Sequence, residues 1–374
     1  MTTEPVRLIL VALALAAGAS AQAATEGPRM AMQQVDVFTS GAEGYHTFRI
    51  PALVVSTKGT LLAFCEGRRK GRGDAGDIDL MLKRSLDGGA TWQAMQLVHE
   101  EGGGAPITIG NPCPVVDQAT GTIHLVLSRN NARAFHTHSA DDGATWAAPV
   151  EITPVLKGFD FPRSRHGTGP GHGIQLTAGP HKGRLLVPLW LNERIGRNYR
   201  SAVLASDDGG RTWRAAGMAG PQLRDANECM AFEAADGSLC LNMRNKVGHR
   251  RSVAWSRDGG LTWSEPRHDR TLVGPVCQAS ILALPAKAPG EPRLVVFANP
   301  ASTRREKMTV RLSRDEAKTW AAARLVHPGP AAYSDLAALP GGAIGCLYER
   351  GDKHPYQKIT FARFPLEWLA APPK

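Results

Sequence analysis

One eight-residue pattern, Ser-x-Asp-x-x-x-Thr-Trp, occurs five times in this chain of 374 residues. Its copies begin 54, 67, 50 and 57 residues apart, and they contain five of the eight tryptophans. They are Ser85–Trp92, Ser139–Trp146, Ser206–Trp213, Ser256–Trp263 and Ser313–Trp320. A repeat of this length is typical of the four-stranded blades of a β-propeller. Because residues 25–374 hold roughly six such periods, we predict an all-β fold, a six-bladed β-propeller.

Each copy of the pattern predicts a tight turn between two strands. Its aspartate accepts hydrogen bonds from turn amides, a glycine supplies a positive φ, and the tryptophan packs on the blade. In the fifth copy Ala317 stands where the other four copies have glycine, so we expect a slightly strained turn there. Segments 79–84, 122–127 and 309–312 largely alternate as short strands do, and no long helical period occurs. The repeat therefore defines the fold and the blade register, but not the function.

The N-terminus has the pattern of a secretory signal. Arg7 precedes an unbroken apolar run over residues 8–17, and small residues including Ala21-Gln22-Ala23 follow it. A run of this length is too short for a membrane span, which needs about 20 residues. We therefore predict a cleaved signal peptide over residues 1–24, one propeller domain over residues 25–374, and an exported, soluble mature protein. The alternatives are an uncleaved anchor and a fortuitous Ala-rich start.

Composition and charge restrict the class of partner. The chain is 43% hydrophobic and 21% charged, which is typical of a globular protein with a sizeable core. Its net charge of +10 favours an anionic partner. However, the arginines are spread along the chain rather than gathered in blocks or interleaved with aromatics, so we predict no nucleic-acid partner. A small acidic substrate held by a few arginines fits the charge, as does a basic solubilising surface.

Three other sequence patterns were considered as cofactor or metal sites, and none of them predicts one. The six cysteines lack Cys-x-x-Cys spacing, so we expect mostly small buried side chains, with a bridge between Cys229 and Cys240 left open. His136-Thr137-His138 has no third metal ligand at useful spacing, and a surface strand is the better interpretation. Gly71-x-Gly73-x-x-Gly76 matches a dinucleotide fingerprint, but a strand rather than a helix is predicted after it.

Outside the repeat, Phe48-Arg49-Ile50-Pro51 precedes the first copy by a few dozen residues. Arg49 lies among apolar neighbours, where an unpaired guanidinium is costly, so it needs anionic partners. Together with the five turns, which match Asp boxes, this motif resembles the bacterial exo-sialidases of the retaining neuraminidase type, over nearly all of the mature chain. The resemblance implies that Arg49 binds the carboxylate of a sialic acid and that Glu349 supports Arg49.

The same resemblance implies further arginines around the substrate. The family binds the carboxylate with three arginines, since planar guanidinium groups match a carboxylate better than ammonium groups do. The second matches Arg244. For the third, spacing to the following strand favours Arg305, with Arg304 as the alternative. Arg68 matches another active-site arginine, near the carboxylate and the catalytic acid.

Three residues match the catalytic positions of the family. Tyr333 matches its nucleophile and Glu228 the base that activates the tyrosine. A neutral phenol avoids the repulsion that a carboxylate nucleophile meets at a carbon bearing a carboxylate, but its pKa near 10 requires a base. Asp74, in the Gly-rich loop, matches the acid/base, with Asp77 and Asp79 as competitors. A general acid needs a raised pKa, which we expect once bound sugar excludes water.

These residues predict an exo-α-sialidase that removes terminal sialic acids from glycoconjugates with retention, as a monomer without metal or organic cofactor. Residues 167–176 resemble the family's Gly-Pro-Gly-x-Gly-Ile-Gln segment, so we expect them to line the glycerol and N-acetyl side of the pocket. The rival predictions are a trans-sialidase, an enzyme that prefers a deaminated sialic acid, and a non-catalytic sialoglycan-binding propeller. The last of these needs the arginines but not Glu228, Tyr333 and Asp74.

Overall fold

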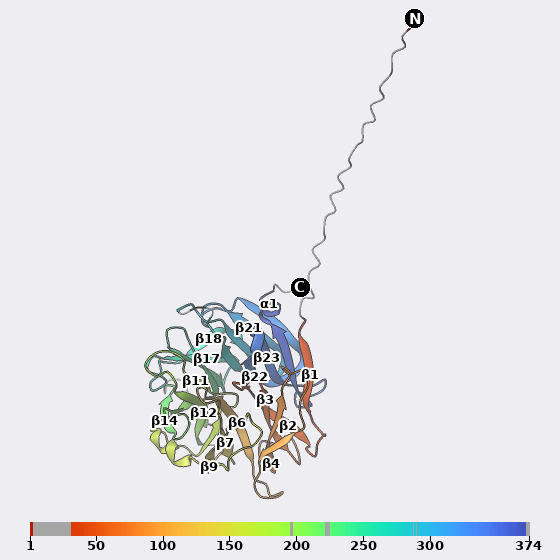
Figure 1. Cartoon of the computed structure of the whole chain (residues 1–374). Helices are drawn as coiled ribbons and strands as arrows, with labels where there is room; N and C mark the ends of the chain where they lie inside the picture. The colour runs from red at the N-terminus through yellow and green to blue at the C-terminus, as the bar shows by residue number, and fades with distance from the viewer. Residues whose placement is uncertain (3–30, 195–196, 221–224, 287, 289, 372–374) are drawn as a thin grey trace.

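The computed structural model describes residues 1–2, 31–194, 197–220, 225–286, 288 and 290–371. Its strands form six blades around a common centre, which confirms the predicted all-β propeller (Figure 1). Four blades are separate sheets. The other two share β22 (Ala322–Ala338), which is the outermost strand of one blade in its first half and the innermost strand of the next in its second half. The predicted signal peptide lies outside the described residues, apart from Met1 and Thr2.

In the first four blades the strands follow chain order from the centre outwards. The first two blades comprise β2 (Thr47–Val55), β3 (Leu61–Arg68), β4 (Ile78–Ser85), β5 (Gln96–His99), then β6 (Ile109–Val116), β7 (Ile123–Arg129), β8 (Arg133–Ser139) and β9 (Val150–Glu151). The next two comprise β10 (Arg165–Thr168) with β11 (Ile174–Gln175), β12 (Leu185–Arg194), β13 (Arg197–Ser206), β14 (Arg214–Met218), then β15 (Ala226–Glu233), β16 (Leu239–Asn245), β17 (Arg250–Ser256) and β18 (Arg267–Val273).

The last two blades close the ring. They comprise β19 (Ser280–Ala283), β20 (Val295–Pro300), β21 (Glu306–Ser313) and β22, then β23 (Ala343–Arg350), β24 (Lys358–Pro365) and β1 (Gln33–Thr39). Because the N-terminal β1 pairs antiparallel with β24, both ends of the propeller belong to one blade (Figure 1). The helical segments of the described residues are η1 (Thr153–Gly158), η2 (Pro340–Gly342) and α1 (Leu366–Ala370). Within this part of the chain, no helix is both long and apolar enough to cross a membrane.

Six apolar clusters hold the blades together, one between each pair of neighbours. The tryptophan of every repeat packs into the cluster between its own blade and the preceding one, which refines the predicted packing on the blade. Trp92, for example, contacts Phe361 of β24 edge-on with ring centres 5.5 Å apart, across the closure of the ring. Full burial of a large apolar side chain contributes roughly 1.5–3 kcal/mol, and the partly buried tryptophans contribute a share of this, so the repeat stabilises the contacts between blades.

The repeat turns all connect the third and fourth strands of a blade. In the first copy, the Asp87 carboxylate accepts hydrogen bonds from the Thr91 amide at 2.9 Å and from the Thr91 hydroxyl at 2.5 Å. The Ser85 hydroxyl accepts one from the Gly89 amide at 2.8 Å, and the other copies repeat this arrangement. Ala317 has φ +65°, which costs a residue with a Cβ about 1 kcal/mol. The expected strain in the fifth turn is therefore present.

All six cysteines are buried and free, as expected for most of them, but the bridge between Cys229 and Cys240 does not form. In the ladder between β15 and β16, Cys229 lies opposite Met243, whereas Cys240 lies opposite Phe232. The two thiols are therefore separated along the strands. Since a disulfide requires nearby Cα atoms, this register excludes the bridge.

Stacked imidazole rings between the second and third blades predict that the folded protein loses stability in acid. The rings of His124 and His136 lie 5.2 Å apart, with their nearest nitrogens at 3.0 Å. Burial, together with neighbouring imidazoles, lowers the pKa of His124 to about 4 and of His136 to about 3. Unfolded histidine titrates near 6.5, so the unfolded chain binds more protons below that pH and folding stability falls from pH 6.5 towards pH 4, by up to about 1.4 kcal/mol per pH unit per histidine.

Urea unfolding at pH 7 and pH 5 measures this loss. We expect His136→Gln to reduce the difference between the two pH values, and His249→Gln, at an exposed side chain between β16 and β17, to leave it unchanged. Equal pH dependence in the wild type and in His136→Gln would contradict this explanation.

Candidate active site

The predicted site residues meet at one face of the propeller. Innermost strands begin at this face and second strands, which run antiparallel to them, end there. Ends of strands from different blades thus converge. The residues are Arg49 of β2, Arg68 of β3, Asp74 of the β3–β4 loop, Glu228 of β15, Arg244 of β16, Arg305 just before β21, Tyr333 of β22 and Glu349 of β23.

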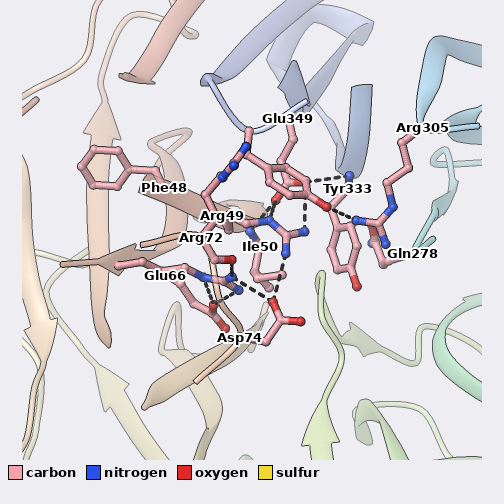
Figure 2. Close-up of polar contacts among 12 residues, drawn as sticks. Phe48, Arg49, Ile50, Glu66, Arg72, Asp74, Gln278, Arg305, Tyr333 and Glu349 are labelled. Carbon is pink, nitrogen blue, oxygen red and sulfur yellow. Dashed lines mark hydrogen bonds and ion pairs between the residues drawn. The ribbon is translucent and has the colours of Figure 1, made fainter. Parts of the chain in front are cut away.

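Arg49 is held by Glu349 in a buried, two-pronged ion pair. Its Nε and Nη2 donate to the two carboxylate oxygens of Glu349 at 3.1 and 3.2 Å. The same oxygens accept hydrogen bonds from the amides of Ile50 at 2.9 Å and Tyr333 at 3.1 Å. Burial opposes the charge of Arg49, but Glu349 outweighs it and raises the pKa of Arg49. Figure 2 shows Arg49 in contact with both Glu349 and Asp74.

Ile50 has a left-handed backbone, with φ +62°. This conformation is strained for a β-branched residue and requires support from its surroundings. The ladder between β2 and β3 is irregular between Arg49 and Ala52, and the Ile50 amide is held by Glu349. A bulge of this kind redirects a side chain, so the strain at Ile50 accompanies the turn of Arg49 towards the site.

Tyr333, Glu228 and Arg244 form a connected buried cluster. The Tyr333 hydroxyl donates to Glu228 Oε1 at 2.5 Å. Arg244 Nη1 donates to Glu228 Oε2 and, at 2.9 Å, to the oxygen of Tyr333. Burial and the charge of Glu228 raise the pKa of Tyr333, while Arg244 opposes this. Glu228 is therefore placed to accept the phenol proton, and Arg244 to stabilise the phenolate that remains.

Asp74 contacts two arginines from its loop. Its Oδ1 accepts from Arg68 Nη1 at 2.8 Å and from Arg49 Nη1 at 3.1 Å, and its side chain is 80% exposed. The groups around the carboxylate partly desolvate it, which opposes ionisation, but the positive charges of Arg68 and Arg49 outweigh this and lower the pKa of Asp74. Of its competitors, Asp79 accepts from the Tyr45 hydroxyl and Asp77 lies 3.9 Å from Arg69. Asp74 alone of the three contacts Arg49 among the described residues.

Arg68 anchors the loop that carries Asp74. This buried arginine pairs with Glu66 at 2.7 Å, and its Nη1 also donates to the carbonyl oxygens of Arg72 at 2.6 Å and Gly73 at 2.9 Å. The loop that resembled a dinucleotide fingerprint runs into strand β4 rather than a helix, as predicted. Arg68 therefore fixes the loop backbone next to Asp74.

The side chains of Arg305 and Arg304 have different surroundings. Arg304 is 81% exposed and pairs with Glu306. Arg305 donates to the Tyr356 hydroxyl and to the Val276 carbonyl at 3.1 Å, and its guanidinium carbon lies 5.6 Å from the ring centre of Tyr333. Figure 2 shows Arg305 close to Tyr333. The geometry thus favours Arg305 as the third arginine at the site.

Tyr356 is a residue of the site that the sequence did not single out. Its ring lies under Arg49, with the guanidinium carbon 3.8 Å from the ring centre, a distance at which a cation and an aromatic face attract. Its hydroxyl is bonded to Arg305. Tyr356 therefore positions two of the arginines at once.

We expect Tyr356→Phe to raise KM about three- to tenfold for a substrate whose carboxylate these arginines bind, with little change in kcat, because the loss of one hydrogen bond loosens Arg305. Steady-state kinetics measures both constants. Tyr45→Phe removes a buried hydroxyl bonded to Asp79, away from these arginines, and serves as the control. A fall in kcat with unchanged KM would contradict a positioning role.

The segment that was expected to line the substrate pocket reaches the opposite end of the propeller. A cavity of about 620 Å³ is lined by the far ends of innermost strands, such as Leu53 and Ala231, and also by residues 172–175. Ile174 and Gln175 pair with Leu186 and Leu185 at the start of β12, which lies at that far end. The expectation is therefore wrong for residues 172–175.

No group of three histidine, cysteine, aspartate or glutamate side chains suited to a metal ion occurs within the described ranges. His136 and His138, which were interpreted as a surface strand face, lie on β8, but only His138 is exposed, because His136 stacks on His124 between two blades.

The chain is similar to several known proteins. A family model described as a BNR repeat-like domain matches residues 59–346. A sialidase of Micromonospora viridifaciens is 36% identical, over 89% of this chain and 54% of that protein. An exo-alpha-sialidase of Aspergillus fumigatus is 32% identical, over 90% of this chain and 88% of that protein. A solved Hadza microbial sialidase has a TM-score of 0.80 at 29% identity, over 90% of this chain and 69% of that one. The chain thus spans about half the length of the first relative.

Proposed function

This chain belongs to the sialidase family, and on that premise we propose that it is an exo-α-sialidase that hydrolyses terminal sialic acids from glycoconjugates with retention of configuration. The contact that carries the proposal joins Tyr333 to Glu228 at 2.5 Å, beside Arg49, Arg244 and Arg305. One site thus contains arginines that can bind the carboxylate of a sugar and a phenol whose proton Glu228 can accept. Sialidases are the glycosidases that use tyrosine as nucleophile.

In the first step the arginines hold the substrate carboxylate. Glu228 accepts the proton of Tyr333, whose oxygen attacks the anomeric carbon. The bond from that carbon to the aglycone oxygen breaks, and Asp74 gives its proton to this leaving oxygen. Arg244 stabilises the phenolate character of Tyr333 through its 2.9 Å contact.

In the second step Asp74 accepts a proton from water, and the water oxygen attacks the anomeric carbon of the glycosyl-enzyme. The bond to Tyr333 breaks, and Glu228 returns the proton to the phenolate. Two inversions at one carbon give net retention. No step needs a metal or an organic cofactor.

We also propose that the mature protein is exported and acts as a monomer on sialylated glycoconjugates. The apolar run over residues 8–17 supports export, and the arginine cluster supports an anionic sugar as the partner.

Release of a fluorescent aglycone from an α-linked sialoside tests the proposal, with NMR detection of the first product anomer. We expect turnover with the α-anomer of sialic acid formed first. A folded protein without activity on any sialoside would contradict the proposal, and a β-anomer formed first would contradict retention. Repeating the reaction with a galactoside acceptor separates hydrolysis from transfer, because a trans-sialidase yields the sialylated acceptor.

A further inference from the structure

The Asp74 carboxylate contacts two guanidinium groups, and each of these is already paired with another carboxylate. Arg49 is paired with the buried Glu349 and Arg68 with the buried Glu66. Asp74 Oδ1 also contacts both arginines, at 3.1 Å from Nη1 of Arg49 and 2.8 Å from Nη1 of Arg68. Unlike the other two acids it is 80% exposed and lies in a loop with glycines at positions 71, 73 and 76. It can therefore leave Arg49 without losing buried packing.

The contacts of Arg49 restrict where a substrate carboxylate can bind. Glu349 occupies the Nε–Nη2 edge of the guanidinium. The edge left for a second two-pronged contact is the one between Nη1 and Nη2, and Nη1 is the atom that Asp74 contacts. A carboxylate bound there either displaces Asp74 or lies directly beside it.

We propose, resting on the sialidase function above, that the substrate carboxylate competes with ionised Asp74 for Arg49 and thereby drives proton uptake by Asp74. Binding adds a negative charge next to Asp74 and removes one of its two positive partners. Both changes favour the protonated carboxyl. The substrate itself thus converts Asp74 from a paired carboxylate into the acid that the reaction needs, and substrates without a carboxylate leave it ionised.

The charged groups that face Asp74 support this direction. Arg49 approaches from β2 and Arg68 from the end of β3, and the charge of Arg305 acts from the β20–β21 side. The present balance of these charges lowers the pKa of Asp74. Because Glu349 already pairs with Arg49 and Glu66 with Arg68, an added substrate carboxylate shifts this balance towards the protonated form of Asp74.

Isothermal titration calorimetry with 2,3-didehydro-2-deoxy-N-acetylneuraminic acid tests the proposal. This sugar carries the carboxylate but no glycosidic bond to hydrolyse. Titrations at pH 6 in two buffers of different ionisation enthalpy count the protons taken up. We expect the wild type to take up a substantial fraction of one proton, and Asp74→Asn to take up less. We also expect Asp74→Asn to bind the sugar about three- to tenfold more tightly at pH 7, since the competing carboxylate is gone.

Asp77→Asn is the matched control, because Asp77 lies in the same loop but contacts Arg69 instead of Arg49. It should bind the sugar and take up protons as the wild type does. Equal proton uptake by the wild type and Asp74→Asn, or weaker binding by Asp74→Asn alone, would overturn the competition while leaving the sialidase function intact. Absence of binding by all three folded proteins would overturn both.

Discussion

Tyr333→Phe is expected to lower kcat/KM for an α-sialoside by roughly 10³-fold or more, because it removes the nucleophilic oxygen. The ring is buried against Ile50 and Cys277, and phenylalanine fills the same space, so the fold should be retained. Steady-state kinetics on a sialoside with a fluorescent leaving group measures the loss.

Tyr348→Phe is the control for this substitution. Tyr348 is also a buried tyrosine of the sixth blade, on β23, but its hydroxyl has no hydrogen-bond partner among the described residues. We expect full activity in Tyr348→Phe. Full activity in Tyr333→Phe would mean that another residue is the nucleophile.

Glu349→Gln is expected to have the second largest effect, on both stability and activity. The two carboxylate oxygens accept from Arg49 Nε and Nη2 and from the amides of Ile50 and Tyr333, so all four partners are donors. An amide NH₂ in place of either oxygen faces donors and leaves buried groups unsatisfied. Breaking a buried ion pair in this way costs about 3–5 kcal/mol, and the loss of Arg49 alignment should lower kcat/KM about 10²-fold.

Urea unfolding and kinetics on the same preparation separate the two effects. Glu233→Gln is the matched control, because Glu233 is also buried and accepts from the Thr177 and Ala178 amides and from Arg293, but it lines the cavity at the opposite end. It should lose stability while kcat and KM stay near wild-type values. An equal activity loss in both variants would show that destabilisation, rather than the position of Arg49, causes the effect.

The fold was predictable because its signal is local and repeated. Each turn needs only residues within eight positions of one another, and its tryptophan marks a contact between blades. The number of blades followed from the spacing. The register between β15 and β16 was not predictable in this way, and the separation of Cys229 from Cys240 follows from that register.

Those residues of the candidate site that belong to a sequence motif were predictable. Arg49 and Tyr333 lie in such motifs, and the structure brings them together across 284 positions of sequence, with the guanidinium carbon 5.0 Å from the ring centre. Tyr356 was missed because it lies in an irregular loop without a motif, and its contacts with Arg49 and Arg305 depend on closure of the ring. The pairing of Asp74 with two arginines depends on the loop conformation, so the lowered pKa of Asp74 was not predictable from the sequence.

The proposed mechanism requires a covalent bond between Tyr333 and the anomeric carbon. It is tested by mass spectrometry of the protein after reaction with a 2,3-difluoro sialic acid, in which fluoride at C2 leaves and fluorine at C3 slows hydrolysis of the intermediate. We predict a mass increase of one fluorinated glycosyl group on the peptide that contains Tyr333. An adduct on Asp74 or Glu228 instead, or no adduct on a protein that hydrolyses sialosides, would contradict this mechanism.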